Sequence, residues 1–379
     1  MRAMNRKRLI LPSAALLLIA VATARGQTRL ADGVQQFAAL GDFKLASGEV
    51  IRDCRIGYRT LGTLNAEKSN AILWPTWLGG QSHDLLSYVG PGRVVESTQL
   101  RAVDSDEYYV ILVDAIGNGI STSPSNSKAQ PLLKFPRITI RDMVEAEHRL
   151  ATEVLGITHL HAVMGVSMGG MQTFEWAVRY PDFMDLAISI VGSPQSTFED
   201  KLLWTSSIRA IELDPAWHDG APTGPLDPGL VLANLIEEMN STSPDYQIAH
   251  TKPGEFNVFL AEMSKDAKED GGAAADRIRQ RQAIIDLDIP SEFGVTLPLA
   301  AKQVHARMLV FVSPQDHMVN PHPAQEFAAA IGAPVITMDT PCGHLSFGFQ
   351  CVPIGPVVAR FLADPGSVHS QTLHDTSAH

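Results

Sequence analysis

One stretch of this 379-residue chain, residues 161–181 with the sequence HAVMGVSMGGMQTFEWAVRYP, constrains the fold more than any other. It opens with a short apolar run typical of the end of a buried strand. The pentapeptide GVSMG follows at 165–169, and after it comes a helix-like stretch that Pro181 ends. A strand, a sharp turn and a helix with a serine at the apex form a nucleophile elbow. The sequence therefore predicts that Ser167 is a nucleophile. The alternative is a glycine-rich turn in an ordinary doubly wound sheet.

The residue types around Ser167 suit the geometry of such an elbow. The turn forces the serine into a strained backbone conformation. Neighbouring chain passes so close that side chains at 165 and 169 would clash, which explains Gly165 and Gly169. The helix that starts behind Ser167 directs free N–H groups at an oxyanion formed there. We expect the N–H of Met168 to be one of two oxyanion donors.

Short apolar runs that alternate with helical stretches predict a mostly parallel central sheet flanked by helices. A loosely alternating segment at 43–58 predicts an antiparallel hairpin at the edge of that sheet. Thr139 and Asp142 predict a capping box at the start of a helix that Gly156 closes. The predicted buried strands lie at 71–74, 108–114, 186–191, 308–312 and 334–338.

The character of the sequence changes between the strands at 186–191 and 308–312. From 195 to 299 the periodicity is helical and is interrupted by proline and glycine, which predicts a helical cap inserted into the core. The core would then comprise 27–194 and 300–363. The polar residues 364–379 are expected to form a disordered tail.

Three polar residues, Ser167, Asp316 and His344, each follow a predicted strand. In sheets of this kind the functional groups gather at the carboxyl ends of the strands. A serine hydroxyl needs a base to take its proton, and the usual base is a histidine held by a carboxylate. The order Ser, Asp, His along the chain is the order of α/β-hydrolase sites. We therefore expect a Ser167–Asp316–His344 site, with Asp339 as the second choice for the carboxylate.

The second oxyanion donor is expected from the loop after the first central strand. That loop is WLGG at 77–80, and we expect the N–H of Leu78 to serve. The alternative is that the glycines only make a tight turn. His317 and His322 lie near Asp316, but no second ligand motif accompanies them. We therefore expect solvated loop histidines, no metal and no cofactor.

Residues 1–26 have the pattern of a signal peptide. A basic segment that ends at Arg8 precedes an apolar run at 9–21, which is too short to span a bilayer comfortably, and ATA at 22–24 is a small-x-small cleavage site. This predicts cleavage near Ala24 and a periplasmic or secreted protein without a stable membrane anchor. An uncleaved anchor is the alternative. The net charge of −11, with no Lys/Arg block beyond the first residues, argues against a nucleic-acid partner.

The chain has three cysteines, Cys54, Cys342 and Cys351, too few for a disulfide framework. In an oxidising compartment Cys342 and Cys351 could form a disulfide across the segment that carries His344. Two reduced, buried thiols are the alternative.

The stretch from 135 to 194 resembles the homoserine O-acetyltransferase family of α/β-hydrolases. The segments FPRITIRDMVEAEHRL and GVSMGGMQTFEWAVRYPDFMD follow the family's pattern nearly throughout. YRTLGTLNAEKSNAIL, AIELDPAW and the closing motifs around Asp316 and His344 are similar to it as well. The resemblance implies an α/β-hydrolase fold with an inserted helical cap, a Ser167–Asp316–His344 triad and an acyl-enzyme mechanism. It also implies a homodimer that pairs through the cap.

The chain departs from that family at two places. The family's acetyltransferases carry an aspartate directly after the triad histidine, which helps hold the acceptor's amino group, whereas this chain has Leu345. WLG at 77–79 stands where the family has a Leu-Thr-Gly-type sequence. A charged ammonium group without a carboxylate partner is costly to bury. The sequence therefore predicts an exported serine esterase or acyl hydrolase acting on a small-molecule acyl ester. An O-acyltransferase and a non-catalytic binding protein on the same scaffold are the alternatives.

Overall fold

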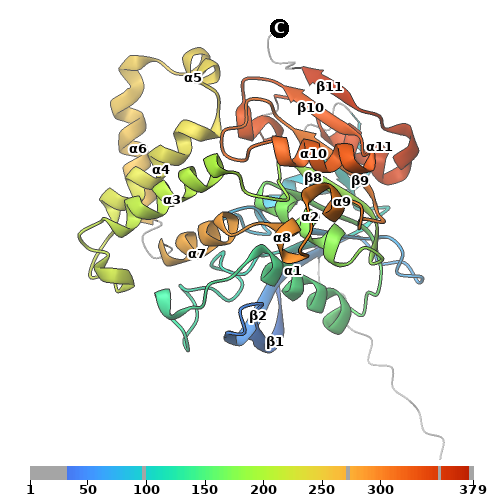
Figure 1. The fold of residues 1–379 in the computed structure, drawn as a ribbon, viewed down its shortest axis with the longest axis horizontal. Helices are drawn as coiled ribbons and strands as arrows, with labels where there is room; N and C mark the ends of the chain where they lie inside the picture. The colour runs from blue at the N-terminus through green and yellow to red at the C-terminus, as the bar shows by residue number, and fades with distance from the viewer. Residues whose placement is uncertain (1–31, 96–99, 270–273, 349–350, 375–379) are drawn as a thin grey trace, which may run out of the picture. The chain divides into compact units, whose positions relative to one another are not determined.

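A nine-stranded sheet runs through the part of the chain that the structure, a computed structural model, describes: residues 32–95, 100–269, 274–348 and 351–374 (Figure 1). The strand order is β1-β2-β6-β3-β7-β8-β9-β10-β11. β1 pairs with β2 and β2 with β6 in antiparallel fashion, and the other neighbours pair in parallel. The mostly parallel sheet that the sequence predicts is thereby confirmed. The strands are β1 (Gln36–Lys44), β2 (Val50–Leu61), β3 (Ala71–Pro75), β6 (Tyr109–Val113), β7 (Leu160–Val166), β8 (Met184–Ile190), β9 (Arg307–Val312), β10 (Val335–Asp339) and β11 (Gln371–His374).

The central strands are buried on both faces, which explains why they read as continuous apolar runs. All five residues of β3 are buried. Successive residues point to opposite faces, so Ile72 belongs to one apolar core and Leu73 to the other. The same alternation holds for Leu112 and Ile111 in β6. The sheet therefore separates two cores, each of which needs helices to cover it.

The local signals at the N-terminal edge are confirmed. β1 and β2 form the predicted antiparallel hairpin. Thr139 and Asp142 form a reciprocal capping box at the start of α1 (Ile140–Arg149), which continues through a π-helical turn (Leu150–Val154) and ends near Gly156, whose φ is 62°. The other core helices are α2 (Met168–Arg179), α10 (His322–Ile331) and α11 (Gly355–Ala363). Short 3-10 turns lie at Asp84–Tyr88, Leu132–Lys134 and Pro365–Ser367, and a two-stranded sheet joins β4 (Val89–Gly90) to β5 (Val103–Asp104).

The chain between β8 and β9 is helical, as predicted. In Figure 1, α3 to α6 gather to one side of the sheet, and α7 lies nearer to it. Their own apolar core includes Ile211 of α3, Leu230 of α4 and Ile278 of α7. The helices are α3 (Phe198–Glu212), α4 (Asp227–Ser241), α5 (Pro244–His250), α6 (Phe256–Glu269), α7 (Ala274–Ile285), α8 (Ile289–Glu292) and α9 (Leu297–Ala301), with 3-10 turns at His218–Gly220 and Pro253–Glu255.

The disordered tail predicted at 364–379 is wrong for residues 364–374. β11 pairs in parallel with β10 from Ile336 to Asp339, and Val368 is buried in one of the two cores. The polar sequence of β11 gave no strand signal, because an edge strand needs backbone pairing more than apolar side chains. By pairing with β10, the strand β11 covers the hydrogen-bonding edge that β10 would otherwise expose. Residues 375–379 lie outside the described residues.

The predicted signal peptide at 1–26, with its cleavage site near Ala24, also lies outside the described residues. Within them, each helix is too short or too polar to cross a lipid bilayer.

Candidate active site

Ser167 occupies the turn between β7 and α2 in a backbone conformation that side chains rarely adopt, with φ 55° and ψ −121°. A Cβ atom at Gly165 would lie 2.1 Å from the Gly169 carbonyl oxygen, and one at Gly169 would lie 2.6 Å from the Pro75 carbonyl oxygen. Both contacts are far too short, so both positions require glycine. The elbow predicted from the pentapeptide is confirmed in its steric detail.

Ser167, His344 and Asp316 form a chain of hydrogen bonds. Nε2 of His344 lies 2.9 Å from Oγ of Ser167, and Nδ1 lies 2.7 Å from Oδ2 of Asp316. The backbone N–H groups of Met318 and Val319 donate to Oδ1 of Asp316, both at 2.9 Å. The carboxylate therefore holds a proton on Nδ1 and leaves the Nε2 lone pair facing the serine hydroxyl. The side chains of His344 and Asp316 are 7% and 1% exposed, so water competes little for these bonds.

The other titratable side chains that the sequence singled out lie elsewhere. Asp339, the second choice for the carboxylate, is exposed at the end of β10, and its Oδ2 lies 3.2 Å from Nδ1 of His374. His317 and His322 lie outside this hydrogen-bond chain. Among the described residues, no group of three or more His, Cys, Asp and Glu side chains has metal-binding geometry.

The loop of Asp316 is tied to the cap. Oδ1 of Asp200, in the capping box of α3, accepts a hydrogen bond from the Asn320 N–H at 2.9 Å. Asp200 is 3% exposed, and its burial raises the pKa of its carboxyl group. The hydrogen bonds with Thr197 and Asn320 lower this pKa, each by less than burial raises it. Sequence reasoning gave Asp200 no role, although a T-x-x-D capping signal begins at Thr197.

Two backbone segments offer N–H groups for an oxyanion. Met168 is the first residue of α2, so its N–H has no acceptor within the helix. At the loop after β3, the Gly80 N–H donates to the Trp77 carbonyl at 3.0 Å. Within the part of the chain that the structure describes, neither the N–H of Trp77 nor that of Leu78 donates to a protein acceptor. Leu78 thus stays a candidate, and the structure adds the N–H of Trp77.

Buried polar side chains fix this loop from the core side. Nε2 of Gln172 in α2 donates to the Thr76 carbonyl at 3.1 Å. Asp114, fully buried directly after β6, accepts from the N–H of Ser82 at 2.7 Å and from Nδ2 of Asn118 at 3.1 Å. The same Asn118 amide donates to the Gly80 carbonyl at 3.0 Å. Sequence reasoning missed these residues, because most of their partners lie in a loop that is distant along the chain.

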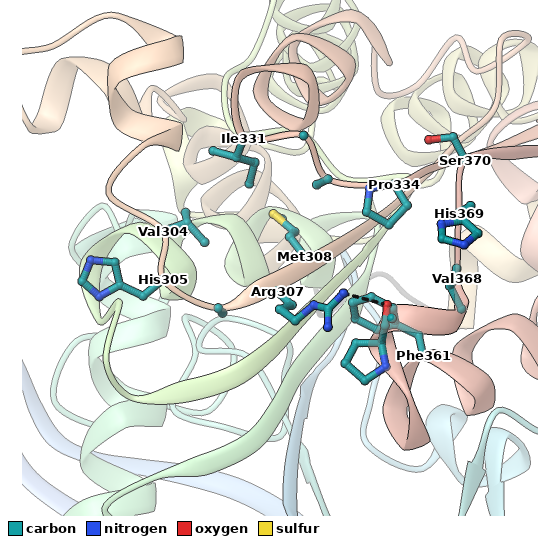
Figure 2. A pocket seen from close by; sticks show the side chains of 15 residues that line it. Val304, His305, Arg307, Met308, Ile331, Pro334, Phe361, Val368, His369 and Ser370 are labelled. Atoms are coloured by element: carbon teal, nitrogen blue, oxygen red, sulfur yellow. Dashed lines mark hydrogen bonds between the residues drawn. The ribbon is translucent and has the colours of Figure 1, made fainter.

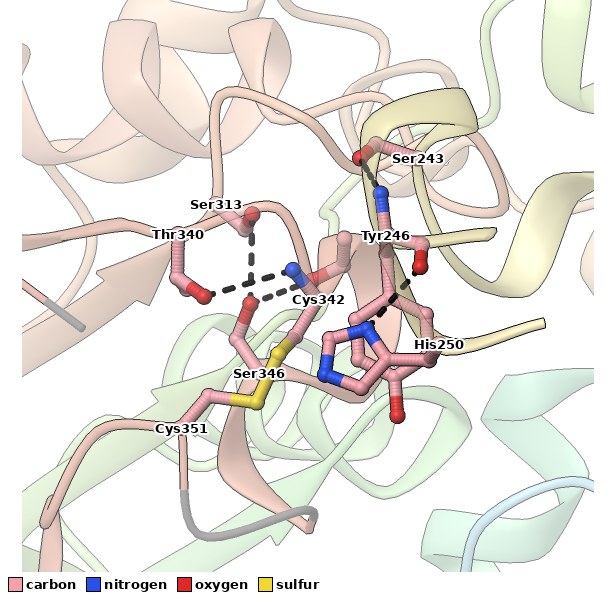
Figure 3. The surroundings of a disulfide bond; sticks show 9 residues. Ser243, Tyr246, His250, Ser313, Thr340, Cys342, Ser346 and Cys351 are labelled. Carbon is pink, nitrogen blue, oxygen red and sulfur yellow. Dashed lines mark hydrogen bonds between the residues drawn. A yellow bond between two sulfur atoms is a disulfide. The ribbon is translucent and has the colours of Figure 1, made fainter. Parts of the chain in front are cut away.

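Cys342 and Cys351 form a disulfide with Cα atoms 6.6 Å apart, which decides between the two alternatives left open by the sequence. The bond closes the segment that contains the 3-10 turn Gly343–Phe347 and hence His344. Figure 3 shows Tyr246 and His250 of the cap helix α5 beside it; their rings stack 4.0 Å apart. Cys54 is a free, buried thiol, and burial raises its pKa to about 12.

The turn that carries His344 and Leu345 ends at Phe347, whose ring lies in an aromatic cluster. Leu345 itself is half-buried. The rings of Trp77 and Phe347 lie 6.2 Å apart, and those of Tyr88 and Phe347 lie 6.4 Å apart. An apolar wall therefore connects the loop after β3 with the turn that carries His344.

A hollow shown in Figure 2 lies at the opposite edge of the sheet. It surrounds the amino-terminal ends of β9 and β10, whereas Asp316 and His344 follow the carboxyl ends of the same strands. Arg307 in this hollow donates to the Pro365 carbonyl at 3.2 Å. Because the hollow lies at the opposite ends of these strands, it takes no part in the chemistry of Ser167.

The comparisons with known proteins agree with this fold. A model of the alpha/beta hydrolase fold family matches residues 85–213. A homoserine O-acetyltransferase of Geotalea daltonii is 30% identical over 361 residues, which cover 86% of this chain and 96% of that protein. The chain belongs to the homoserine O-acetyltransferase-like family of α/β-hydrolases. It is accordingly an enzyme of the α/β-hydrolase type, in a family that holds both esterases and acetyltransferases.

The similarity to esterases of this family is higher but shorter. An ethyl acetate hydrolase of Pseudomonas veronii is 43% identical over 185 residues, which are 48% of this chain and 50% of that protein. The chain thus spans about half the length of the curated esterases that it matches. The structure of an acetylester hydrolase from Corynebacterium glutamicum superposes with a TM-score of 0.77 at 28% identity, covering 87% of this chain and 95% of that one.

Proposed function

We propose that this α/β-hydrolase is an exported serine esterase that cleaves small, uncharged acyl esters through an acyl-enzyme on Ser167. The observation that carries the proposal is Leu345. It places an apolar, half-buried side chain directly after the base histidine in the chain, on the turn that also carries Phe347. Such a surface favours an uncharged alkyl group and gives no charge partner to an ammonium group. Two relatives, one named as a probable esterase at 39% identity and one as an ethyl acetate hydrolase at 43% identity, support the same activity.

Acylation follows from the hydrogen bonds of the site. Nε2 of His344 takes the proton of the Ser167 hydroxyl while Oγ attacks the ester carbonyl carbon. Asp316 stabilises the imidazolium that forms. The carbonyl oxygen becomes an oxyanion and accepts hydrogen bonds from the Met168 N–H and from the N–H of Leu78 or Trp77. When the tetrahedral intermediate collapses, the alcohol leaves with the proton from Nε2.

Deacylation repeats these steps with water as nucleophile. His344 takes a proton from the water while its oxygen attacks the acyl carbon, and the same oxyanion donors act again. The carboxylic acid leaves, and the proton returns from Nε2 to Oγ of Ser167. Hydrolysis and transfer share the acyl-enzyme and differ only in the group that attacks it.

The test measures both reactions with one preparation. Ethyl acetate and 4-nitrophenyl acetate hydrolysis are followed beside acetyl transfer from acetyl-CoA to homoserine. We expect ester hydrolysis that Ser167→Ala abolishes, and no useful O-acetylhomoserine. Efficient O-acetylhomoserine formation with negligible ester hydrolysis would refute the proposal.

Acyl transfer is the second candidate, because the similarity to the Geotalea daltonii acetyltransferase covers nearly that whole protein. It requires an acceptor held in attack geometry so that it outcompetes water. If a panel of alcohols and amines present during ester cleavage diverts the acyl group from acid to new ester or amide, this candidate replaces hydrolysis.

The proposal of export has two supports. Residues 1–26 carry the basic, apolar and small-x-small pattern of a signal peptide. The Cys342–Cys351 disulfide is a bond that persists in oxidising compartments. N-terminal sequencing of protein recovered from the periplasm or medium should begin near Ala24. An intact Met1 in a membrane fraction would count against processing.

A homodimer through the cap is also proposed. Large apolar side chains on the cap helices or at their ends are exposed, and the proposal takes them as the surface that meets the partner: Phe198, Leu213, Met239, Ile248 and Val258. Sedimentation equilibrium should give twice the chain mass, and Ile248→Glu combined with Met239→Glu should shift it to the monomer. A monomeric wild-type protein at micromolar concentration would refute this proposal.

A further inference from the structure

Gln280 of α7 joins the cap to two loops of the core at once. It is 1% exposed. Its Oε1 accepts from the Gly79 N–H at 2.8 Å, and its Nε2 donates to the Ile116 carbonyl at 3.3 Å. One side-chain amide thus bridges the loop after β3, which offers the second oxyanion donor, and the loop after β6. The bridge uses the acceptor and the donor of the amide, and this pair of contacts fixes the orientation of the amide group.

The peptide that Gln280 holds decides the turn type at residues 77–80. The Gly80 N–H donates to the Trp77 carbonyl, the φ of Gly79 is 69° and the φ of Leu78 is negative, which together define a type II turn. A type II turn becomes type I when its central peptide, here Leu78–Gly79, rotates. In the rotated form the Leu78 carbonyl would face Oε1 of Gln280, acceptor against acceptor. Gln280 therefore favours the type II form.

This selection bears on the oxyanion donors. The N–H groups of Trp77 and Leu78 belong to the peptides directly before the one that Gln280 holds. Oxyanion stabilisation depends on donors that are fixed in place before the reaction. A turn that exchanges between two forms would present these N–H groups less well to the developing charge.

Helix α7 is held on the core by other residues besides Gln280. Asp276 accepts from the N–H and the hydroxyl of Ser125 at 2.8 and 2.5 Å. Nε of Arg279 donates to the Phe135 carbonyl at 2.9 Å. The contribution of Gln280 to the loop is therefore separable from the docking of the helix.

From this geometry we infer that Gln280 is a positioning residue for the oxyanion hole. Through Gln280 the cap holds residues 77–80 in the type II turn, in which the N–H groups of Trp77 and Leu78 are fixed for the oxyanion. The inference rests on the proposed acyl-enzyme chemistry. The residue touches no reacting atom and acts through the Gly79 N–H.

The experiment compares Gln280→Leu with wild type and with Gln282→Leu as the matched control. Gln282 lies on the same helix, and its Oε1 accepts from Nη1 of Arg279 at 2.8 Å. With 4-nitrophenyl acetate we expect kcat of Gln280→Leu to fall about 10- to 100-fold, up to the loss seen when an oxyanion donor is removed. KM should change less than about threefold. Gln282→Leu should stay within about twofold of wild type.

Two further readouts separate positioning from stability. A trifluoromethyl ketone forms an oxyanion on Ser167, so its inhibition constant should rise in Gln280→Leu by about the factor by which kcat/KM falls. In Gln280→Glu the carboxyl group can still accept from the Gly79 N–H, but it can donate to the Ile116 carbonyl only when it is protonated. Its activity relative to wild type should therefore rise as the pH falls from about 8 to about 6, which a purely structural role would not produce.

Each outcome bears on the inference. It is overturned if folded Gln280→Leu keeps kcat within about threefold of wild type, or if kcat falls while the inhibition constant does not change. It is also overturned if the Gln280→Glu ratio is flat with pH. If wild type releases a single burst of nitrophenol and then stops, hydrolysis is refuted. The burst rates of the variants then still test Gln280, because acylation uses the same oxyanion donors.

Discussion

Replacing Asp316 by asparagine tests the role of the hydrogen-bond chain at Ser167 with the smallest possible change. The new amide side chain would have two orientations in this site. With its oxygen toward the Met318 and Val319 N–H groups it keeps both 2.9 Å bonds and turns its NH₂ group toward Nδ1 of His344. With the opposite orientation it keeps the bond to His344 but sets a donor against two backbone donors.

The first orientation should prevail, because an unmade buried hydrogen bond costs about 1–3 kcal/mol and the second orientation leaves two of them unmade. His344 must then accept at Nδ1 and carry its proton on Nε2, the nitrogen 2.9 Å from Oγ of Ser167. A protonated Nε2 cannot take the serine proton. We therefore expect kcat to fall about 10⁴-fold, as for the same change in the Ser-His-Asp template, or about 5 kcal/mol of transition-state stabilisation.

The assay is steady-state hydrolysis of 4-nitrophenyl acetate, with Asp339→Asn as the matched control. Asp339 is exposed and contacts His374, so its replacement should leave kcat within about twofold of wild type. The reasoning is refuted if Asp316→Asn keeps kcat within about tenfold of wild type. It is refuted as well if Asp339→Asn shows the large loss, because another carboxylate would then hold the histidine.

Neighbouring features of the molecule can be tested in the same way. Ser167→Ala and His344→Ala should each remove most activity, and the double variant should be scarcely worse, because these residues act as a unit. Replacing Cys342 and Cys351 by serine removes the disulfide and opens a short loop. The unfolding free energy, measured by denaturant unfolding, should then fall by about 2.5 kcal/mol. Wild type should show one thiol when denatured without reductant. Burial raises the pKa of Glu147 to about 8, so wild-type stability should fall as the pH rises from about 5 to about 8, and that of Glu147→Gln should fall less.

The parts of the site that sequence alone predicted correctly are those set by local sterics. Gly165 and Gly169 are required by contacts of 2.1 and 2.6 Å, and any sequence with this elbow must satisfy them. The capping box at Thr139 has the same local character, since both partners lie within one helical turn. Such features depend on a few adjacent residues and need no knowledge of the fold.

The parts that sequence could not decide are set by contacts between distant segments. The sequence ranked Asp316, which follows β9, above Asp339, the last residue of β10, but only the hydrogen bond between His344 and Asp316 separates the two. Gln280 lies 201 residues from Gly79 along the chain, and no periodicity in α7 marks it. The tail was misjudged for a similar reason, because β11 is specified by the open edge of β10 rather than by its own side chains.

The choice between hydrolysis and transfer is the hardest property to predict from the sequence, because both reactions use the same residues to activate Ser167. What differs is the lifetime of the acyl-enzyme against water and the affinity for an acceptor in the same space. In the proposed function Leu345 acts on the second quantity alone, since it offers no charge partner and takes no part in the hydrogen bonds of His344 with Ser167 and Asp316. An acceptor with a charged amino group is therefore disfavoured at binding, whereas water needs no binding site of that kind. Under the proposed function the same site geometry yields hydrolysis, and a transferase on this scaffold would need a carboxylate supplied from another segment, such as the cap.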